Sequence, residues 1–142
     1  KKGCLETENS CSALYRKFIE HLKAGETSIV LSEKSIEDIT LDDIFNAIGK
    51  EDLLAIELVE EIGQQLGVHI GNLINIFNPD TVIIGGEMSN AGEFLLQPII
   101  TTVRKYTLSL MSRDSEIILS KLKSQAGIIG SCLLSRSRMF EA

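Results

Sequence analysis

The stretch NPDTVIIGGEM, residues 78–88, joins a short apolar run to two adjacent glycines and a carboxylate. Residues 81–84 are β-branched and, after Thr81, apolar, which suits a strand that is buried on both faces. Such strands usually lie inside the sheet of an α/β fold. Pro79 fixes its own φ and disfavours the helical region for Asn78, so a preceding helix is expected to end at Phe77.

The composition is typical of one domain with a real core. A chain of 142 residues can bury about 70% of its unfolded surface, so we expect a single domain over residues 1–142. Lys and Arg total 14 against 20 Asp and Glu, a net charge of −6, which argues against a broad phosphate-binding surface. We therefore do not expect this segment alone to bind nucleic acid.

Cysteine usage and hydropathy indicate a cytoplasmic protein. The three cysteines include no close CxxC pair, so a reducing compartment is expected rather than a disulfide framework. The sequence contains no secretion signal and no uncharged apolar run of about 18 residues, so no membrane partner is expected. The chain starts at Lys1 without an initiating methionine, which suggests a part of a longer protein.

Three segments precede the longest element. Apolar residues at spacings of three and four predict an amphipathic helix over residues 10–22, which Gly25 ends. Residues 27–31 fit either a short strand or an extended loop. Thr40 and Asp43 resemble a capping box and predict a short helix that Gly49 ends.

A long helix is predicted from about residue 51 to residue 77. Its apolar stripe recurs at helical spacing: Ala55, Val59, Ile62, Leu66, Ile70, Leu73 and Phe77. Gly63, Gly67 and Gly71 are four apart and share one narrow face, although each costs about 1 kcal/mol relative to alanine. We interpret them as a seam for close approach of another helix or a sheet. The alternative, a membrane helix contact, is disfavoured by Glu57, Glu60 and Glu61.

The remaining segments complete an α/β unit. Residues 90–112 are predicted to be helical, with Pro98 either starting or kinking the main part. Residues 116–120 form a second buried-strand candidate, and residues 125–139 a helix that is apolar nearly all round and should be buried. This order implies two parallel strands joined by a right-handed crossover.

The glycine pair at the end of the first strand is a candidate ligand site. Ligands collect at the carboxyl ends of strands in open α/β folds, and glycines let a ligand approach the backbone. A plain glycine turn at Gly85 and Gly86 is the alternative.

Few other side chains carry an obvious chemistry. Cys4 could supply one zinc ligand, but structural zinc needs four, and an inert residue is the alternative. Glu6 fits either a surface carboxylate favoured by a helix dipole or a partner for the hydroxyls of a polar ligand. His21 and His69 have no carboxylate or cysteine partner evident in the sequence, so packed or solvated roles are expected. The common phosphate-loop, dinucleotide, serine-hydrolase and zinc-protease motifs are absent.

Three stretches together resemble a known family. GCLET at 3–7, INIFNPDTVIIGGEM at 74–88 and AGIIGSCLL at 126–134 are similar to the C-terminal part of ROK proteins, the group of bacterial sugar repressors and sugar kinases. The resemblance implies a ribonuclease H-like α/β fold of the actin and hexokinase superfamily. This chain would be its helix-rich C-terminal subdomain with a small parallel sheet.

The resemblance assigns roles to single positions. Cys4 resembles the last cysteine of the family's CxCGxxGC zinc motif, but the other ligands lie outside this chain. Zinc is therefore expected to be absent or poorly held here and possible in a full-length protein. Glu6 resembles the glutamate that contacts sugar hydroxyls, and Gly85 and Gly86 resemble the pair against the adenosine of ATP in kinase members.

The choice between repressor and kinase depends on Glu87 and on what is absent. The kinases need a DxGxT phosphate loop and a catalytic aspartate, and no DxG occurs here, so no catalytic residue is assigned. Kinase members often have a third glycine where this chain has Glu87, whose charge should weaken ATP binding.

We therefore favour the sugar-sensing and oligomerisation part of a repressor of the xylose and N-acetylglucosamine repressor type. It would bind a small sugar, form a homodimer and reach DNA only through an N-terminal domain outside this chain. The alternatives are the C-terminal half of an ATP-dependent sugar kinase, and an oligomerisation fragment without a ligand.

Overall fold

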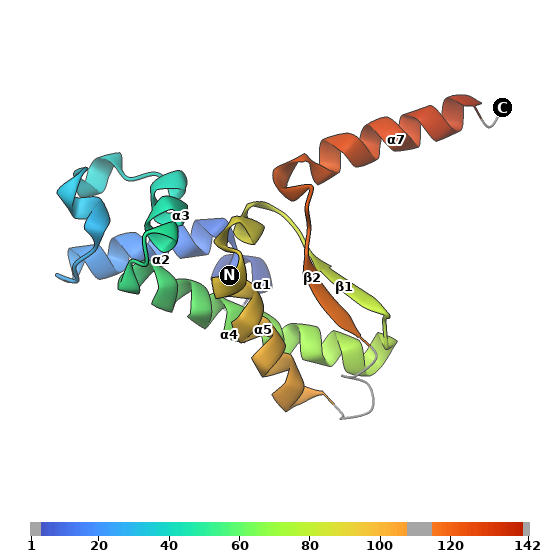
Figure 1. Ribbon diagram of the computed structural model, residues 1–142, viewed down its shortest axis with the longest axis horizontal. Coiled ribbons are helices and arrows are strands. Elements are labelled where there is room, and N and C mark those ends of the chain that lie inside the picture. Colours follow the sequence, from blue (N-terminus) through green and yellow to red (C-terminus); the bar gives the residue numbers. More distant parts are fainter. Residues whose placement is uncertain (1–3, 108–114, 141–142) are drawn as a thin grey trace.

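A computed structural model describes residues 4–107 and 115–140. Helices α1 to α5 gather around the longest of them, α4, while two strands lie beside them and α7 projects away (Figure 1). The helices are α1 (Leu5–Asn9), α2 (Cys11–Lys23), α3 (Leu41–Gly49), α4 (Leu53–Phe77), α5 (Glu93–Tyr106) and α7 (Ala126–Phe140). The strands are β1 (Thr81–Ile84) and β2 (Glu116–Leu119). Short 3-10 turns are η1 (Ile29–Ser32), η2 (Ile36–Asp38), η3 (Glu87–Ala91) and η4 (Lys123–Gln125).

Helices α2 and α3 begin where the sequence predicts, whereas α1 was not predicted as a helix. The Ser10 hydroxyl accepts a hydrogen bond from the Ala13 amide and so caps α2. At α3, the amide and the hydroxyl of Thr40 both donate to Asp43 Oδ2, at 2.8 and 2.7 Å. Residues 27–31 are neither strand nor plain loop, because Ser28 caps the turn η1 and Val30 is buried beneath it.

The long helix α4 has about the predicted length, but its last turns bury other residues than the predicted apolar stripe. Its N-cap is Asp52, and Asn78 ends it with a left-handed φ of 44°. Ile70 and Ile74 are buried, whereas Leu73 is 50% exposed and Phe77 71% exposed. The predicted stripe is therefore wrong at Leu73 and Phe77, because the buried face is offset by one position at this end.

The glycine seam of α4 packs against α5, as predicted. A Cβ on Gly63 would stand 3.0 Å from the Leu95 carbonyl oxygen and from Pro98 Cβ. Pro98 lies inside α5 and does not start it, since the predicted segment 90–112 divides into η3 and α5. Residues 108–112 of that prediction lie outside the described residues.

The two strands form the predicted parallel pair. Thr81 pairs with Glu116 and Ile84 with Leu119, and α5 lies in the crossover between them. Burial on both faces is wrong: Ile83 is 63% exposed, while Val82 and Ile84 pack against the core. The described helices cover only one face of the sheet, so the β-branched run is half-buried.

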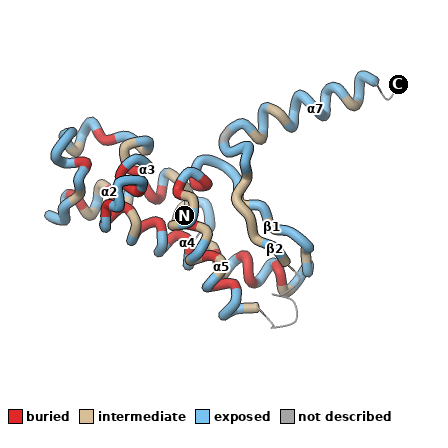
Figure 2. Tube along the Cα trace, in the orientation of Figure 1, coloured by how far each residue is buried: buried red, intermediate tan, exposed pale blue. Residues whose placement is uncertain are grey.

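The last helix forms where predicted, but its predicted burial is wrong. Figure 2 shows α7 as exposed or intermediate along its whole length, away from the buried centre formed by α2 to α5. Ile128 is 68% exposed and Met139 74% exposed. None of the described elements covers its apolar side chains. Within the described residues, no helix has both the length and the apolarity that crossing a membrane requires.

Candidate functional site

One pocket gathers most of the sequence-predicted site residues. It has a volume of about 380 Å³ and lies between α1, the start of α2, the middle of α4 and the segment that follows β1. Its lining residues are Glu6, Asn9, Ser10, Cys11, Ser12, Leu66, Ile84, Gly85, Gly86, Glu87 and Met88. Glu6 and the glycine pair, more than 75 residues apart in sequence, therefore share one site, which we name the glycine-pair pocket.

The loop after β1 has a conformation that requires glycine at one position. Gly86 has a φ of 78°, in the region that side chains rarely adopt, and a Cβ there would meet nothing within 4 Å. Ser89 fixes the loop, because its hydroxyl donates to the Gly86 carbonyl at 2.6 Å. Met88 is buried in the core, whereas Glu87 is exposed at the pocket wall. The structure therefore fits both interpretations of Gly85 and Gly86. The glycines form a tight turn, and their backbone is also open to a ligand.

Negative charge surrounds the start of α2. Burial, followed by the charges of Glu87 and Glu6, raises the pKa of the Cys11 thiol above its usual value. Both carboxylates line the glycine-pair pocket and act on a thiol in the first turn of α2. Among the lining residues that the structure describes, there is no Lys or Arg.

Asn9 is a pocket residue that the sequence reading missed. The residue is 8% exposed, and its Oδ1 atom has no hydrogen-bond partner in the described part of the chain. Asn9 also lines a neighbouring hollow of about 320 Å³, together with Cys4, Gln65 and His69. The sequence offered one signal: a strongly polar residue one position before the Ser10 cap, on the turn that carries Glu6.

The residues near Cys4 do not fit a zinc site. Cys4 is exposed, and in the chain segments described here no three His, Cys, Asp or Glu side chains gather closely enough to hold a metal ion. Cys4 thus supplies at most one of the four ligands that structural zinc requires. Zinc binding in the natural protein remains a prediction.

The two histidines differ from each other. His69 is exposed beside Cys4, as expected for a solvated residue. His21, for which no carboxylate partner was expected, lies with its Nδ1 2.8 Å from Glu26 Oε1. The turn after α2 brings the two together, because Glu26 follows Gly25, whose φ is 100°.

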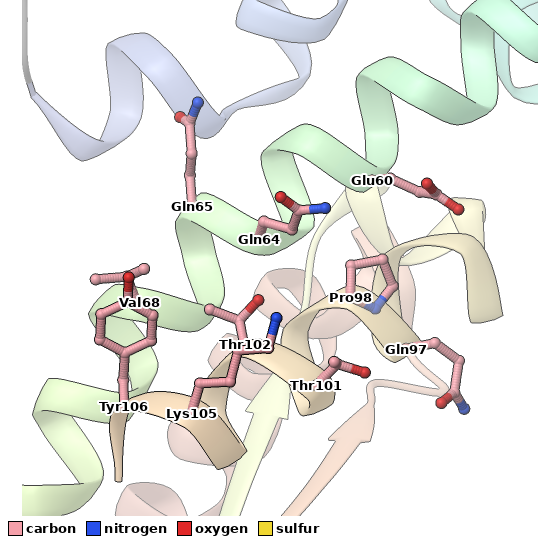
Figure 3. A pocket seen from close by; sticks show the side chains of 10 residues that line it. All are labelled: Glu60, Gln64, Gln65, Val68, Gln97, Pro98, Thr101, Thr102, Lys105 and Tyr106. Atoms are coloured by element: carbon pink, nitrogen blue, oxygen red, sulfur yellow. The ribbon is translucent and has the colours of Figure 1, made fainter.

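A larger hollow of about 520 Å³ lies beside the glycine seam. Figure 3 shows that its walls are side chains of α4 and α5, among them Gln64, Thr101 and Lys105. None of the sequence-predicted site residues lines it. Its lining comes from α4 and α5 alone, and no glycine of the seam belongs to it.

Comparison with known proteins identifies the family. A model described as the ROK family matches residues 1–138. The chain belongs to the ROK family. A glucokinase from Halalkalibacterium halodurans is 34% identical over 131 residues, covering 92% of this chain and 40% of that protein. An N-acetylglucosamine repressor from Escherichia coli O157:H7 is 31% identical over 137 residues, covering 96% of this chain and 33% of that protein.

Solved ROK structures have the same fold. A ROK family transcriptional regulator, a homologue of the E. coli MLC protein, has a TM-score of 0.83 at 30% identity, over 96% of this chain and 34% of that one. A ROK family glucokinase from Streptomyces griseus, in complex with glucose and AMPPNP, also has a TM-score of 0.83, at 25% identity, over 96% of this chain and 46% of that one. The fold is therefore the ribonuclease H-like fold of the actin and hexokinase superfamily. The chain spans between a third and a half of the length of these relatives.

Proposed function

We propose that this chain is the sugar-sensing part of a ROK-type transcriptional repressor of carbohydrate metabolism genes. The observation that carries the proposal is the glycine-pair pocket, which joins Glu6 to Gly85, Gly86 and Glu87. In this proposal Glu6 accepts hydrogen bonds from sugar hydroxyls, and the open backbone of the glycines forms another part of the wall. DNA binding would belong to a separate basic domain, since this chain has a net charge of −6.

Charge favours the repressor over the kinase. A nucleoside triphosphate needs cationic partners, and the described lining of the pocket offers two carboxylates without Lys or Arg. Glu87 extends from the loop that would approach the adenosine and the phosphates. This arrangement supports a sensor for a sugar and disfavours ATP.

The second candidate is the C-terminal half of an ATP-dependent sugar kinase. The identity to a glucokinase and the match to a glucokinase complexed with glucose and AMPPNP favour it. In that case Gly85 and Gly86 would lie against the adenosine, and the phosphate loop and catalytic aspartate would come from residues outside this chain.

The helix α4 offers a route from the pocket to the rest of the domain. Leu66 lines the pocket on one side of α4, and Gly63 and Gly67 face α5 on another. A sugar that contacts this turn would favour one arrangement of α4 and α5, and so shift a population of states between high and low DNA affinity. In a homodimer, such a shift would change the contact between the two subunits and so the DNA affinity.

The test uses the protein in the form that its gene encodes. Calorimetric titration with D-glucose, D-xylose and N-acetyl-D-glucosamine should give binding to at least one sugar, and Glu6→Gln should weaken that binding at least tenfold. Glu57→Gln, an exposed glutamate of α4, is the matched control and should change nothing.

Two further readouts separate the candidates. For a repressor, the sugar alters the gel shift of DNA upstream of its own gene, and MgATP neither binds nor is consumed. Sugar-dependent ATP consumption would establish the kinase instead. Absence of binding to all three sugars, with a dimer still present, would favour an oligomerisation fragment and overturn both sugar proposals.

A further inference from the structure

We infer that Asn9 is a ligand-binding residue of the glycine-pair pocket and that the ligand it serves is an uncharged, hydroxyl-rich molecule. The inference rests on the proposed sugar site and goes beyond it, because it names a second ligand acceptor and the charge class of the sugar. Asn9 was not among the sequence-predicted site residues.

The first argument is the state of the Asn9 side chain. Its Oδ1 atom is buried and lacks a hydrogen-bond partner in the described chain, and the residue, which is 8% exposed, contributes to the lining of two pockets. Buried side-chain oxygens in folded proteins almost always have a partner, since leaving one without a partner destabilises the protein. A donor from a molecule in the pocket removes that penalty.

The second argument is the position of Asn9 relative to Glu6. The two residues are three apart on α1, so their side chains emerge from the same side of one short helix. Both line the glycine-pair pocket, and both offer oxygen acceptors. Two acceptors on one wall match a ligand that presents two donors on one face, as neighbouring sugar hydroxyls do.

The third argument concerns charge. The N-terminus of α2, at Ser10 and Cys11, would attract an anion if it were free. Glu6 and Glu87 line the same pocket and both act on the Cys11 thiol at this end of the helix, and the described lining residues include no Lys or Arg to offset them. A phosphate group on the ligand would face two carboxylates, so the phosphorylated form of a sugar should bind more weakly than the free sugar.

The experiment compares Asn9→Leu and Asn9→Ala with the wild-type protein as its gene encodes it. Leucine keeps the branched shape of the side chain with a somewhat larger volume and removes the acceptor, whereas alanine removes both the acceptor and the volume. Titration uses the sugar among D-glucose, D-xylose and N-acetyl-D-glucosamine that binds wild type most tightly. We expect both variants to lose at least tenfold in affinity, and Asn90→Ala, an exposed asparagine in η3, to lose none.

Thermal unfolding without sugar supplies the second readout. If Oδ1 has no partner in the free protein, Asn9→Ala unfolds at the same temperature as wild type or higher, while sugar stabilises it far less. A clear fall in its unfolding temperature without sugar would mean that Asn9 holds a structural partner, and would overturn the inference. Unchanged sugar affinity in both variants would overturn it as well.

A third comparison tests the charge class. D-glucose 6-phosphate and N-acetyl-D-glucosamine 6-phosphate should bind at least tenfold more weakly than the parent sugars. Equal or tighter binding of a phosphate ester would refute an uncharged ligand. If wild type binds no sugar at all, the proposed function itself fails. If wild type binds a sugar and both Asn9 variants bind it equally well, only the role of Asn9 fails.

Discussion

Gly67 lies so close to Thr102 that a Cβ added to the glycine would stand 2.6 Å from Thr102 Cβ and 2.9 Å from the Ile99 carbonyl oxygen. Real Cβ atoms essentially never approach that closely, so α4 and α5 contact each other there almost backbone to backbone. Gly67→Ala should therefore destabilise the protein by about 1–3 kcal/mol, although alanine by itself favours a helix by about 1 kcal/mol. Urea unfolding followed by circular dichroism measures the change.

A matched glycine in another helix supplies the control. Gly127 lies in α7, and a Cβ there would meet nothing within 4 Å. Gly127→Ala should leave stability unchanged or raise it by up to about 1 kcal/mol. Equal effects of the two substitutions would refute the interpretation of Gly67 as a close-contact position.

Asp52 holds two segments together and should be sensitive to truncation. Its Oδ1 accepts from the Ala55 amide at 3.0 Å, and its Oδ2 accepts from the Ile29 amide at 2.8 Å. Asp52→Ala removes the cap of α4 and leaves the Ile29 amide without its acceptor, which should cost about 2–3 kcal/mol. Asp52→Asn keeps one oxygen and should lose about half of that. Asp42→Ala, an exposed acid in the first turn of α3, should cost a few tenths of a kcal/mol. A similar loss in Asp42→Ala and Asp52→Ala would contradict the bridging role.

Asp43 should make part of the stability depend on pH. Hydrogen bonds from Lys34, at 2.8 and 2.9 Å, and from Thr40 lower the pKa of Asp43 from 3.8 to about 2. A carboxyl with a lowered folded pKa stabilises the protein above its unfolded pKa and loses that contribution as the pH falls through the folded value. The difference in unfolding temperature between wild type and Asp43→Asn should thus be constant from pH 7 to pH 5 and shrink between about pH 4 and pH 2. A difference that stays constant down to pH 2 would contradict this origin.

Cys11 should react slowly with alkylating reagents. Its raised pKa, caused by burial and by the charges of Glu87 and Glu6, lowers the fraction of thiolate at pH 8. Iodoacetamide should modify it more slowly than the exposed Cys132, as peptide mass spectrometry can measure. Glu87→Gln removes one of the raising charges and should accelerate alkylation of Cys11 severalfold while leaving Cys132 unchanged. An identical rate in both proteins would show that Glu87 does not act on the thiol.

The sequence predicted elements whose signals are local. The cap at Ser10, the Thr40–Asp43 pair and the spacing of Gly63, Gly67 and Gly71 act within a few residues or along one helix face, and each appears in the structure. Burial was predicted less well, because it depends on what covers a surface. Ile83 and the apolar side chains of α7 have the residue types of a core, yet the described chain places nothing over them.

The residues of the candidate site that resemble family positions were predicted from the sequence. Residues without such a resemblance were missed. Glu6 and the glycine pair were named from the sequence, and the structure brings them into one pocket. Asn9 was missed, because an asparagine in a short helix has many ordinary roles and only its burial and lack of a partner set it apart. His21 was misjudged for the reverse reason: its partner Glu26 becomes evident only when the turn at Gly25 is known.

The glycine-pair pocket is lined partly by the end of β1 and the loop after it, and partly by helices. In the described chain β1 pairs only with β2, so each strand has one edge without a strand partner, and a two-stranded unit of this kind is marginally stable by itself. Amide hydrogen exchange should therefore be faster in β1 and β2 than at buried positions of α4, through local unfolding of the strands. Gly85 and Gly86 follow β1 directly, whereas Glu6 and Leu66 belong to the helical wall. A molecule that contacts both walls would slow exchange in the strands, so its affinity would include the free energy of ordering this part of its own site.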